Sequence, residues 1–333
     1  MIRSETAKDG ELMQLLHWIR QGNVSRKTRE LALMTDSLRT YIAQFDSLHE
    51  INGILFRYRQ ATQKSQAFNQ IVIPASLREL ALSESHDSFQ SGHFGFYKTK
   101  STFQRFFYWA GYKEQLFNYV GSCQVCFGRR GPAARKSQTR TSIFYAQPMD
   151  CLFLDVIHLP YGGGKYKYIL TCVDAFSRWP EAFPLERIST KIILQVLQTQ
   201  VFARFGVPKV IKTDNATYFK SRMWKEVIKF LRIHHPDKIA YRPQSRGVVE
   251  NFNRYIQDAL AKFLHQDQRV IWPDLLPLIL LAFRNSTHLA TGFSPAQLFL
   301  GHPLRTPSDN LIAYPPDKST TSYSQVFKLR RRT

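Results

Sequence analysis

Four residues with metal-binding side chains constrain the fold of this chain more than any other feature. His86, His93, Cys123 and Cys126 follow the pattern H-x6-H-x29-C-x2-C. Two imidazoles and two thiolates complete a tetrahedral zinc site with no open position, which is typical of a structural site. The segment TKSTFQRFFYWAGYKEQLFNYV that separates the two pairs is aromatic and compatible with helices. We therefore predict one structural Zn²⁺ that holds a small helical domain together. The alternative is an accidental Cys-x-x-Cys pair beside ordinary surface histidines.

Charge and cysteine content narrow the class of protein. The 333 residues include 46 Lys and Arg against 25 Asp and Glu, a formal charge of +21. This excess favours a polyanionic partner, most simply nucleic acid. Four cysteines in a chain of this length argue against a disulfide scaffold and for a reducing compartment. The aliphatic run Leu275–Phe283 lies between two charged residues and is far shorter than the roughly 20 residues of a membrane span, so we expect a buried helix and no membrane partner.

The second half of the chain has the pattern of an α/β domain. Apolar runs of strand length occur at residues 151–159, 165–176 and 179–185, and the first two are joined by a turn that contains Gly162 to Gly164. A helical pattern at 189–205, a strand KVIKTD, a helix at 221–232, a strand at 238–241 and a long helix from about Ser245 follow. Three strands joined by hairpins and then alternating helices and strands indicate a mixed sheet.

The hydrophobic pattern divides the chain into five regions. We predict an N-terminal extension of helices and short strands at 1–80, the zinc-binding domain at 81–128, a basic linker at 129–145, a catalytic core at 146–305 and a flexible basic tail at 306–333. The linker is rich in Gly, Pro, Ser and Thr, and it either contacts a DNA phosphate backbone or is a solvated connector. Its basic residues are Arg129, Arg130, Arg135, Lys136 and Arg140.

Three acidic residues occupy unusual positions in the core. Asp155 lies inside an apolar strand, Asp214 ends another strand, and Glu250 lies one turn into the last long helix. A charge in a buried strand costs several kcal/mol unless it is paired or binds a metal. Three carboxylates suit two Mg²⁺ (or Mn²⁺) ions, which need one bridging acid and one further acid each.

The long helix separates its apolar and polar residues by face. An apolar stripe at helical spacing leaves Glu250 on a polar stripe with Arg254 and Gln257, so Glu250 can point toward a site at the sheet edge. A surface pair between Glu250 and Arg254 is the alternative. The apolar stripe consists of Val249, Phe252, Ile256, Leu260 and Phe263.

These motifs resemble the integrase of LTR retrotransposons, the gypsy type in particular, and are similar to retroviral integrases. SHDSFQSGHFGFYKT and CQVC match the zinc module of that family, and FLDVIHLP, IKTDNATYF and YRPQSRGVVENFNR match its three catalytic segments. Residues 215–249 separate Asp214 from Glu250 by the interval typical of the family, and TGFSPAQLFLGHPLRTP matches the segment that closes the core. The resemblance extends to about residue 308. It implies an RNase H-like mixed-sheet core after a small helical zinc-binding domain, Mg²⁺ dependence, oligomeric assembly on DNA ends and action in the nucleus. The resemblance also implies that the three acids are ligands of the catalytic metal and that the two histidines and two cysteines are zinc ligands.

The chain departs from the family pattern at several positions. Ala216 stands where the family usually has glycine, and a left-handed backbone there would disfavour alanine by about 1 kcal/mol. Arg242 replaces a common histidine, Asn251 a common arginine, and Ala110 a common proline. A polar tail ending KLRRRT stands where members usually continue into a third module, so we expect a processed fragment, a truncated element or a stand-alone gene. None of these departures removes a ligand.

The function that we predict is DNA integration by a polynucleotidyl transferase, which trims 3′ ends of element DNA and joins them to target DNA as a homo-oligomer. Two alternatives stay open: a catalytically inactive, domesticated DNA- or chromatin-binding protein with an integrase fold, and an RNase H acting on hybrids. The zinc module argues against the RNase H. Candidate contacts to double-stranded DNA are the linker residues Arg129, Arg130, Arg135 and Lys136, with Gln244, Asn251, Arg254 and Gln257 on the long helix.

Overall fold

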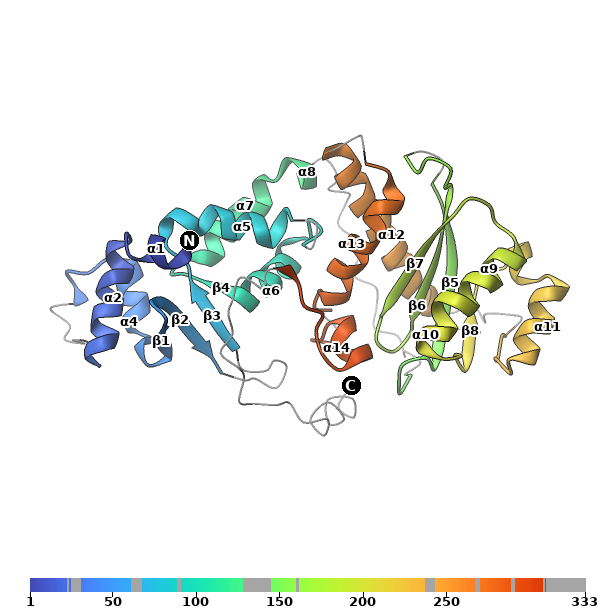
Figure 1. Ribbon diagram of the computed structural model, residues 1–333, viewed down its shortest axis with the longest axis horizontal. Helices are drawn as coiled ribbons and strands as arrows, with labels where there is room; N and C mark the ends of the chain where they lie inside the picture. Colours follow the sequence, from blue (N-terminus) through green and yellow to red (C-terminus); the bar gives the residue numbers. More distant parts are fainter. Residues whose placement is uncertain are drawn as a thin grey trace. The chain divides into compact units, whose positions relative to one another are not determined.

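A computed structural model describes residues 1–22, 24, 31–60, 68–88, 91–127, 145–159, 162–236, 243–266, 270–288, 291–307 and 309, with the backbone alone at 243–246 and 265–266. They form two compact units (Figure 1). The first contains the described residues of Met1–Phe127 and those from Arg305 on, and the second contains the described residues from Tyr145 to Leu304. The linker residues Arg129, Arg130, Arg135, Lys136 and Arg140, the predicted strand at 238–241, and nearly all of the predicted tail lie outside the described residues.

The first unit combines helices with a four-stranded sheet of order β1-β2-β3-β4 (Figure 1). Strands β1, β2 and β3 are antiparallel, and β4 pairs parallel to β3. Asp9 and Thr35 begin helices α2 and α4 because their side chains accept hydrogen bonds from the backbone N–H three residues on. The elements are α1 (Ile2–Thr6), α2 (Gly10–Gln21), α4 (Asp36–Ile42), η1 (Phe45–Ser47), β1 (Leu48–Ile51), β2 (Ile54–Arg59), β3 (Phe68–Val72), η2 (Ala75–Leu77), α5 (Arg78–His86), α6 (Phe96–Phe106), β4 (Phe107–Tyr108), α7 (Tyr112–Ser122) and α8 (Gln124–Phe127).

One hydrophobic core runs through this unit. Strand β4 lies between α6 and α7 of the zinc-binding region, yet it pairs with β3, which the preceding sequence supplies. Leu15 of α2, Ile71 of β3 and Trp109 after β4 are at most 1% exposed and belong to the same cluster of buried side chains. The residues predicted as an extension and those predicted as a zinc domain therefore share one sheet and one core.

The second unit is built on a mixed sheet of order β7-β6-β5-β8 (Figure 1). Strands β5, β6 and β7 form an antiparallel meander and β8 is parallel to β5, which confirms the predicted α/β architecture. The elements are β5 (Cys151–His158), β6 (Tyr168–Asp174), β7 (Pro180–Leu185), α9 (Thr190–Val196), the π-helix η3 (Leu197–Phe202), α10 (Ala203–Phe205), β8 (Val210–Lys212), η4 (Thr217–Phe219), α11 (Arg222–Phe230), α12 (Pro243–Gln266), α13 (Trp272–Asn285) and α14 (Pro295–Leu300).

Alternate residues of β5 face two separate cores. Leu152 and Leu154 pack with α9, η3 and α11, whereas Phe153 and Ile157 pack with α12 and α13. Because side chains alternate along a strand, Asp155 lies on the α12 face between Phe153 and Ile157. The predicted apolar stripe of α12 is buried against this face: Val249, Phe252, Ile256, Leu260 and Phe263 are each at most 6% exposed.

The turn between β5 and β6 explains the glycines in the sequence. Gly162 and Gly164 have φ of +73° and +60°, which favours glycine. A Cβ on Gly163 would lie 2.1 Å from Nε1 of Trp272, so α13 packs directly against the turn. Leu275, Leu276, Ile279 and Leu280 of α13 are buried, as predicted, whereas Leu278 on the opposite side of the helix is 37% exposed. Across the described parts of the chain, no helix is both long and apolar enough to cross a membrane.

Candidate metal centres

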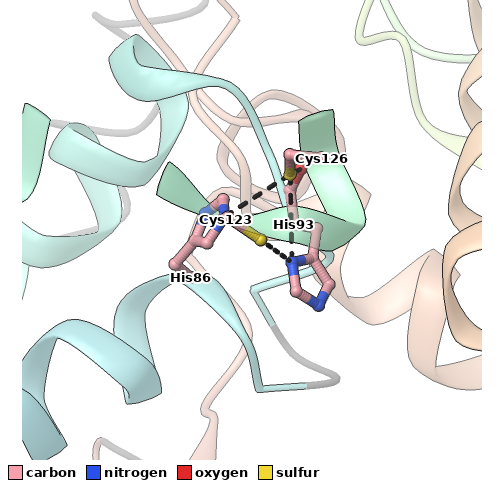
Figure 2. A group of neighbouring side chains, drawn as sticks. All are labelled: His86, His93, Cys123 and Cys126. Atoms are coloured by element: carbon pink, nitrogen blue, oxygen red, sulfur yellow. Dashed lines mark hydrogen bonds between the residues drawn. The ribbon is translucent and has the colours of Figure 1, made fainter. Parts of the chain in front are cut away.

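The four predicted zinc ligands meet in the first unit (Figure 2). His86 ends α5 and His93 follows in a loop, whereas Cys123 directly follows α7 and Cys126 lies in α8. One ligand atom from each residue lies within 4.8 Å of all the others. Nε2 of His86 is 3.5 Å from Sγ of Cys126, and Nδ1 of His93 is 3.6 Å from Sγ of Cys123.

These distances fit a tetrahedral zinc ion. Zinc–nitrogen bonds of about 2.0 Å and zinc–sulfur bonds of about 2.3 Å place nitrogen and sulfur about 3.5 Å apart across a tetrahedral edge. Both histidines are at most 2% exposed, so the site is closed on that side. His93 has a left-handed backbone with φ of +47°, an uncommon conformation for a residue other than glycine. The loop therefore adopts a strained turn at the residue whose ring faces the thiols.

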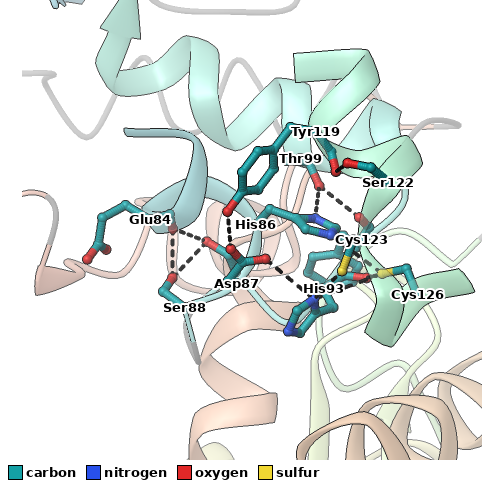
Figure 3. Close-up of polar contacts among 12 residues, drawn as sticks. Glu84, His86, Asp87, Ser88, His93, Thr99, Tyr119, Ser122, Cys123 and Cys126 are labelled. Atoms are coloured by element: carbon teal, nitrogen blue, oxygen red, sulfur yellow. Dashed lines mark hydrogen bonds and ion pairs between the residues drawn. The ribbon is translucent and has the colours of Figure 1, made fainter. Parts of the chain in front are cut away.

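A polar group supports the loop beside His93 (Figure 3). The Tyr119 hydroxyl of α7 donates to the Asp87 carboxylate, whose other oxygen lies 3.8 Å from Nδ1 of His93. Burial and the neighbouring Asp87 carboxylate raise the pKa of Tyr119, which keeps its hydroxyl a donor. Asp87 thus places negative charge beside the proposed cation.

The second candidate centre lies at one edge of the mixed sheet. The last register pair between β5 and β8 joins Phe153 to Lys212. Asp155 and Asp214 each follow two residues later, and because the strands are parallel the two acids reach the same edge. Glu250 comes from α12, which packs on the face of β5 and β6 that carries Asp155.

The pKa of Asp155 responds to burial and to the other two acids. Burial raises the pKa of Asp155, and the carboxylates of Asp214 and Glu250 raise it further. Asp214 and Glu250 are themselves exposed. Burial and the charges of Asp214 and Asp155 raise the pKa of Tyr218 to about 12. A concentration of negative charge around a half-buried acid is the arrangement that a divalent cation relieves.

Two residues at this centre escaped the sequence analysis. Nδ2 of Asn253 donates to Oδ2 of Asp155 at 2.7 Å, and the Thr171 hydroxyl donates to Oδ1 of Asn253 at 3.0 Å. Thr171 is fully buried and is the register partner of Asp155 on β6. Asn253 lies three residues after Glu250, so a polar residue at that helical spacing was the available signal.

The structure also describes Ala216, the start of α12 and the candidate DNA contacts on that helix. Ala216 has φ of −64° and ψ of 149°, so its backbone is not left-handed and the penalty that such a backbone would impose on alanine does not arise. Helix α12 begins at Pro243 instead of Ser245, which puts Glu250 about two turns into it. Asn251, Arg254 and Gln257 are exposed, and Arg254 donates to Oδ1 of Asn251 at 2.7 Å. The backbone of Gln244 is helical, and its side chain is outside the described atoms.

Comparison with known proteins gives both units a family. Residues 73–132 match the family model "Integrase zinc binding domain", and residues 146–243 match "Integrase core domain". The chain is 35% identical over 214 residues to the Pol polyprotein of Radiation murine leukemia virus (strain Kaplan), and 33% identical over 216 residues to the Gag-Pol polyprotein of Baboon endogenous virus (strain M7). Each alignment covers 63% of this chain, but 36% and 12% of the respective polyprotein, so the chain spans a minor part of these relatives.

Two solved structures are similar to parts of the chain. The HTLV-2 integrase catalytic core domain in complex with magnesium is 23% identical, with a TM-score of 0.39, and covers 46% of this chain and 97% of that chain. A simian T-cell lymphotropic virus intasome in complex with a PP2A regulatory subunit is 20% identical, with a TM-score of 0.44, and covers 66% and 76%.

The chain has a His2Cys2 group followed by a mixed sheet, and each of these two parts matches an integrase family model. The two domain matches and the Pol relatives support a relationship to the integrases of LTR retroelements. They do not separate the gypsy type from the retroviral type.

Proposed function

We propose that this chain is a DNA integrase, a metal-dependent polynucleotidyl transferase that trims the 3′ ends of element DNA and joins them to target DNA. The observation that carries the proposal is the strand register: Asp155 and Asp214 each lie two residues beyond the paired residues Phe153 and Lys212 of parallel strands, and α12, which carries Glu250, packs on the face of Asp155. Burial and, after it, the carboxylates of Asp214 and Glu250 raise the pKa of Asp155.

The three acids differ in a way that suits different roles. Asp155 is half-buried and held by Asn253, so it is the fixed ligand that would bridge both ions. Asp214 and Glu250 are exposed and would each complete one ion. Two Mg²⁺ or Mn²⁺ ions, when bound, activate the attacking oxygen and stabilise the leaving 3′ oxygen.

The reaction needs no covalent enzyme intermediate. In end trimming, a water oxygen attacks the phosphorus and the 3′ oxygen of the retained strand leaves. In joining, that 3′-OH attacks a target phosphorus, its proton passes to solvent, and the target 3′ oxygen leaves. One phosphodiester bond breaks and one new phosphorus–oxygen bond forms in each step.

In the first unit we propose one structural Zn²⁺ bound by His86, His93, Cys123 and Cys126. Support comes from the agreement of the ligand spacing with tetrahedral geometry and from the match to the zinc-binding family model. No open position is needed there, since the module has a structural task.

Double-stranded DNA, both element ends and target, is the proposed substrate, and the chain would act on it as a homo-oligomer in the nucleus. The formal charge of +21 supports a polyanionic partner. The alternative of a pure DNA- or chromatin-binding protein loses one of its arguments, because Ala216 is unstrained.

A strand-transfer assay tests the proposal. Wild type, Asp155→Asn and Glu250→Gln are incubated with Mg²⁺ or Mn²⁺ and oligonucleotides matched to the ends of the encoding element. Glu226→Gln is the matched control, because Glu226 is an exposed acid on α11 that pairs with Arg222. We expect trimming and joining by wild type and by the control, and loss of both in the two site variants with DNA binding retained. Wild type that binds DNA without joining it would favour the binding function, and joining by Asp155→Asn would refute the assignment of the site.

A further inference from the structure

A buried hydroxyl lies against one of the zinc-ligand histidines (Figure 3). Oγ1 of Thr99, on α6, is 3.2 Å from Nδ1 of His86, and it is 2.8 Å from the backbone oxygen of Phe94. Thr99 is 1% exposed and His86 is fully buried. The opposite ring nitrogen of His86, Nε2, is the one that faces Sγ of Cys126.

The hydroxyl has a single proton, and the carbonyl decides where that proton goes. A backbone oxygen can only accept, so the contact at 2.8 Å requires Thr99 to donate to Phe94. The Thr99 oxygen can then only accept from His86, which places a proton on Nδ1. In neutral imidazole the other nitrogen is then free of a proton.

We propose that Thr99 is a positioning residue for the zinc site: its hydroxyl holds His86 in the tautomer that presents the Nε2 lone pair to the metal. A ligating histidine commonly donates its second N–H to a fixed acceptor, which sets the ring orientation and makes the ligand more basic. The inference rests on the zinc site proposed above. It adds a residue that the His2Cys2 pattern does not contain.

The test compares zinc affinity in full-length variants. Thr99→Val keeps the shape and removes the hydroxyl, and Thr99→Ser keeps the hydroxyl. Thr102→Val is the matched control, because Thr102 lies on the same helix but its hydroxyl donates to the backbone of Lys98. Competition with a chromophoric chelator measures Zn²⁺ affinity, and Co²⁺ substitution reports the ligand geometry.

We expect Thr99→Val to lose about 10–100-fold in zinc affinity, the usual effect of removing such a partner. Thr99→Ser should recover most of the loss, and Thr102→Val should match wild type. Wild-type affinity in Thr99→Val overturns the proposal, and so does a loss in Thr99→Ser as large as in Thr99→Val, because retaining the hydroxyl would then not protect zinc binding.

A measurement on wild type guards against a variant that fails to fold. In the zinc-loaded protein, ¹⁵N imidazole shifts should identify Nδ1 of His86 as protonated and Nε2 as metal-bound. The reverse assignment overturns the proposal without any substitution. Wild type that binds no zinc would instead refute the zinc site itself, so the two failures are distinct.

Discussion

Asn253 controls the position and charge of the central acid, and its removal gives a measurable prediction. Its Nδ2 donates to Asp155 at 2.7 Å, and a hydrogen bond to a charged group contributes about 1.5–3 kcal/mol. Since about 1.4 kcal/mol corresponds to a factor of ten, Asn253→Ala should lower metal-dependent strand transfer by roughly 10- to 150-fold. The bond also lowers the pKa of Asp155. Its loss should therefore raise that pKa and shift the acid limb of the activity profile to higher pH.

The assay is strand transfer against pH at several Mg²⁺ concentrations. The control is Asn118→Ala, because Asn118 is an exposed asparagine on α7 in the other unit. If Asn253 acts through its link to Thr171, then Thr171→Val should also weaken activity, and the double variant should lose less than the two single losses combined. Activity of Asn253→Ala within twofold of wild type, with an unmoved acid limb, would refute the reasoning.

Three further predictions concern stability. Arg284→Met should lower the free energy of unfolding, measured in urea, by about 3–5 kcal/mol, because Glu181 is only 5% exposed and loses the ion-pair partner that lies 2.7 Å away. Arg222→Met, at an exposed ion pair, should lower it by at most about 1 kcal/mol. The raised pKa of Asp155 means that its ionised form destabilises the metal-free fold above the ordinary carboxyl range. Asp155→Asn should therefore raise the thermal midpoint in chelator at pH 7 and abolish the further rise on adding Mg²⁺; a lower midpoint would contradict this. Zinc removal should increase amide exchange in α8 and the loop containing His93, while β2 and β3 stay protected by the shared hydrophobic core of the first unit; global loss of protection would count against this.

The parts of the fold set by local periodicity were predictable. Strand β5, the apolar stripe of α12 and the helical spacer between the zinc ligands follow from patterns of 2.0 and 3.6 residues. The acids were found for the same reason: an acid inside an apolar strand stands out against its neighbours. Cys123 and Cys126 needed only their spacing, since two residues between sulfurs is a metal-binding separation.

Features that depend on pairing between distant segments were not predictable. The two-residue strand β4 is too short to give a pattern, and it is defined by its bonds to β3. The links of Thr171 and Thr99 depend on register and on helix packing, which no single stretch of sequence encodes. The backbone conformation at Ala216 was likewise left open by the sequence, and the structure shows it to be extended, so alanine carries no penalty there.

The two candidate metal centres differ in how their side chains interact when no metal is bound. In the first unit, the ring nitrogens of the two histidines lie at hydrogen-bonding distance from the two cysteine sulfurs. Contacts of this kind can hold the four side chains together in the absence of zinc. In the second unit, burial and then repulsion from the carboxylates of Asp214 and Glu250 raise the pKa of Asp155, whereas hydrogen bonds from the Val156 backbone N–H and from Asn253 lower it. Asp214 and Glu250 avoid part of the repulsion by staying in water. A cation held by two exposed ligands exchanges with solvent more readily than one held by two buried imidazoles. Dialysis against a chelator should accordingly remove Mg²⁺ before Zn²⁺, and loss of zinc first would show that burial of the histidines does not govern retention.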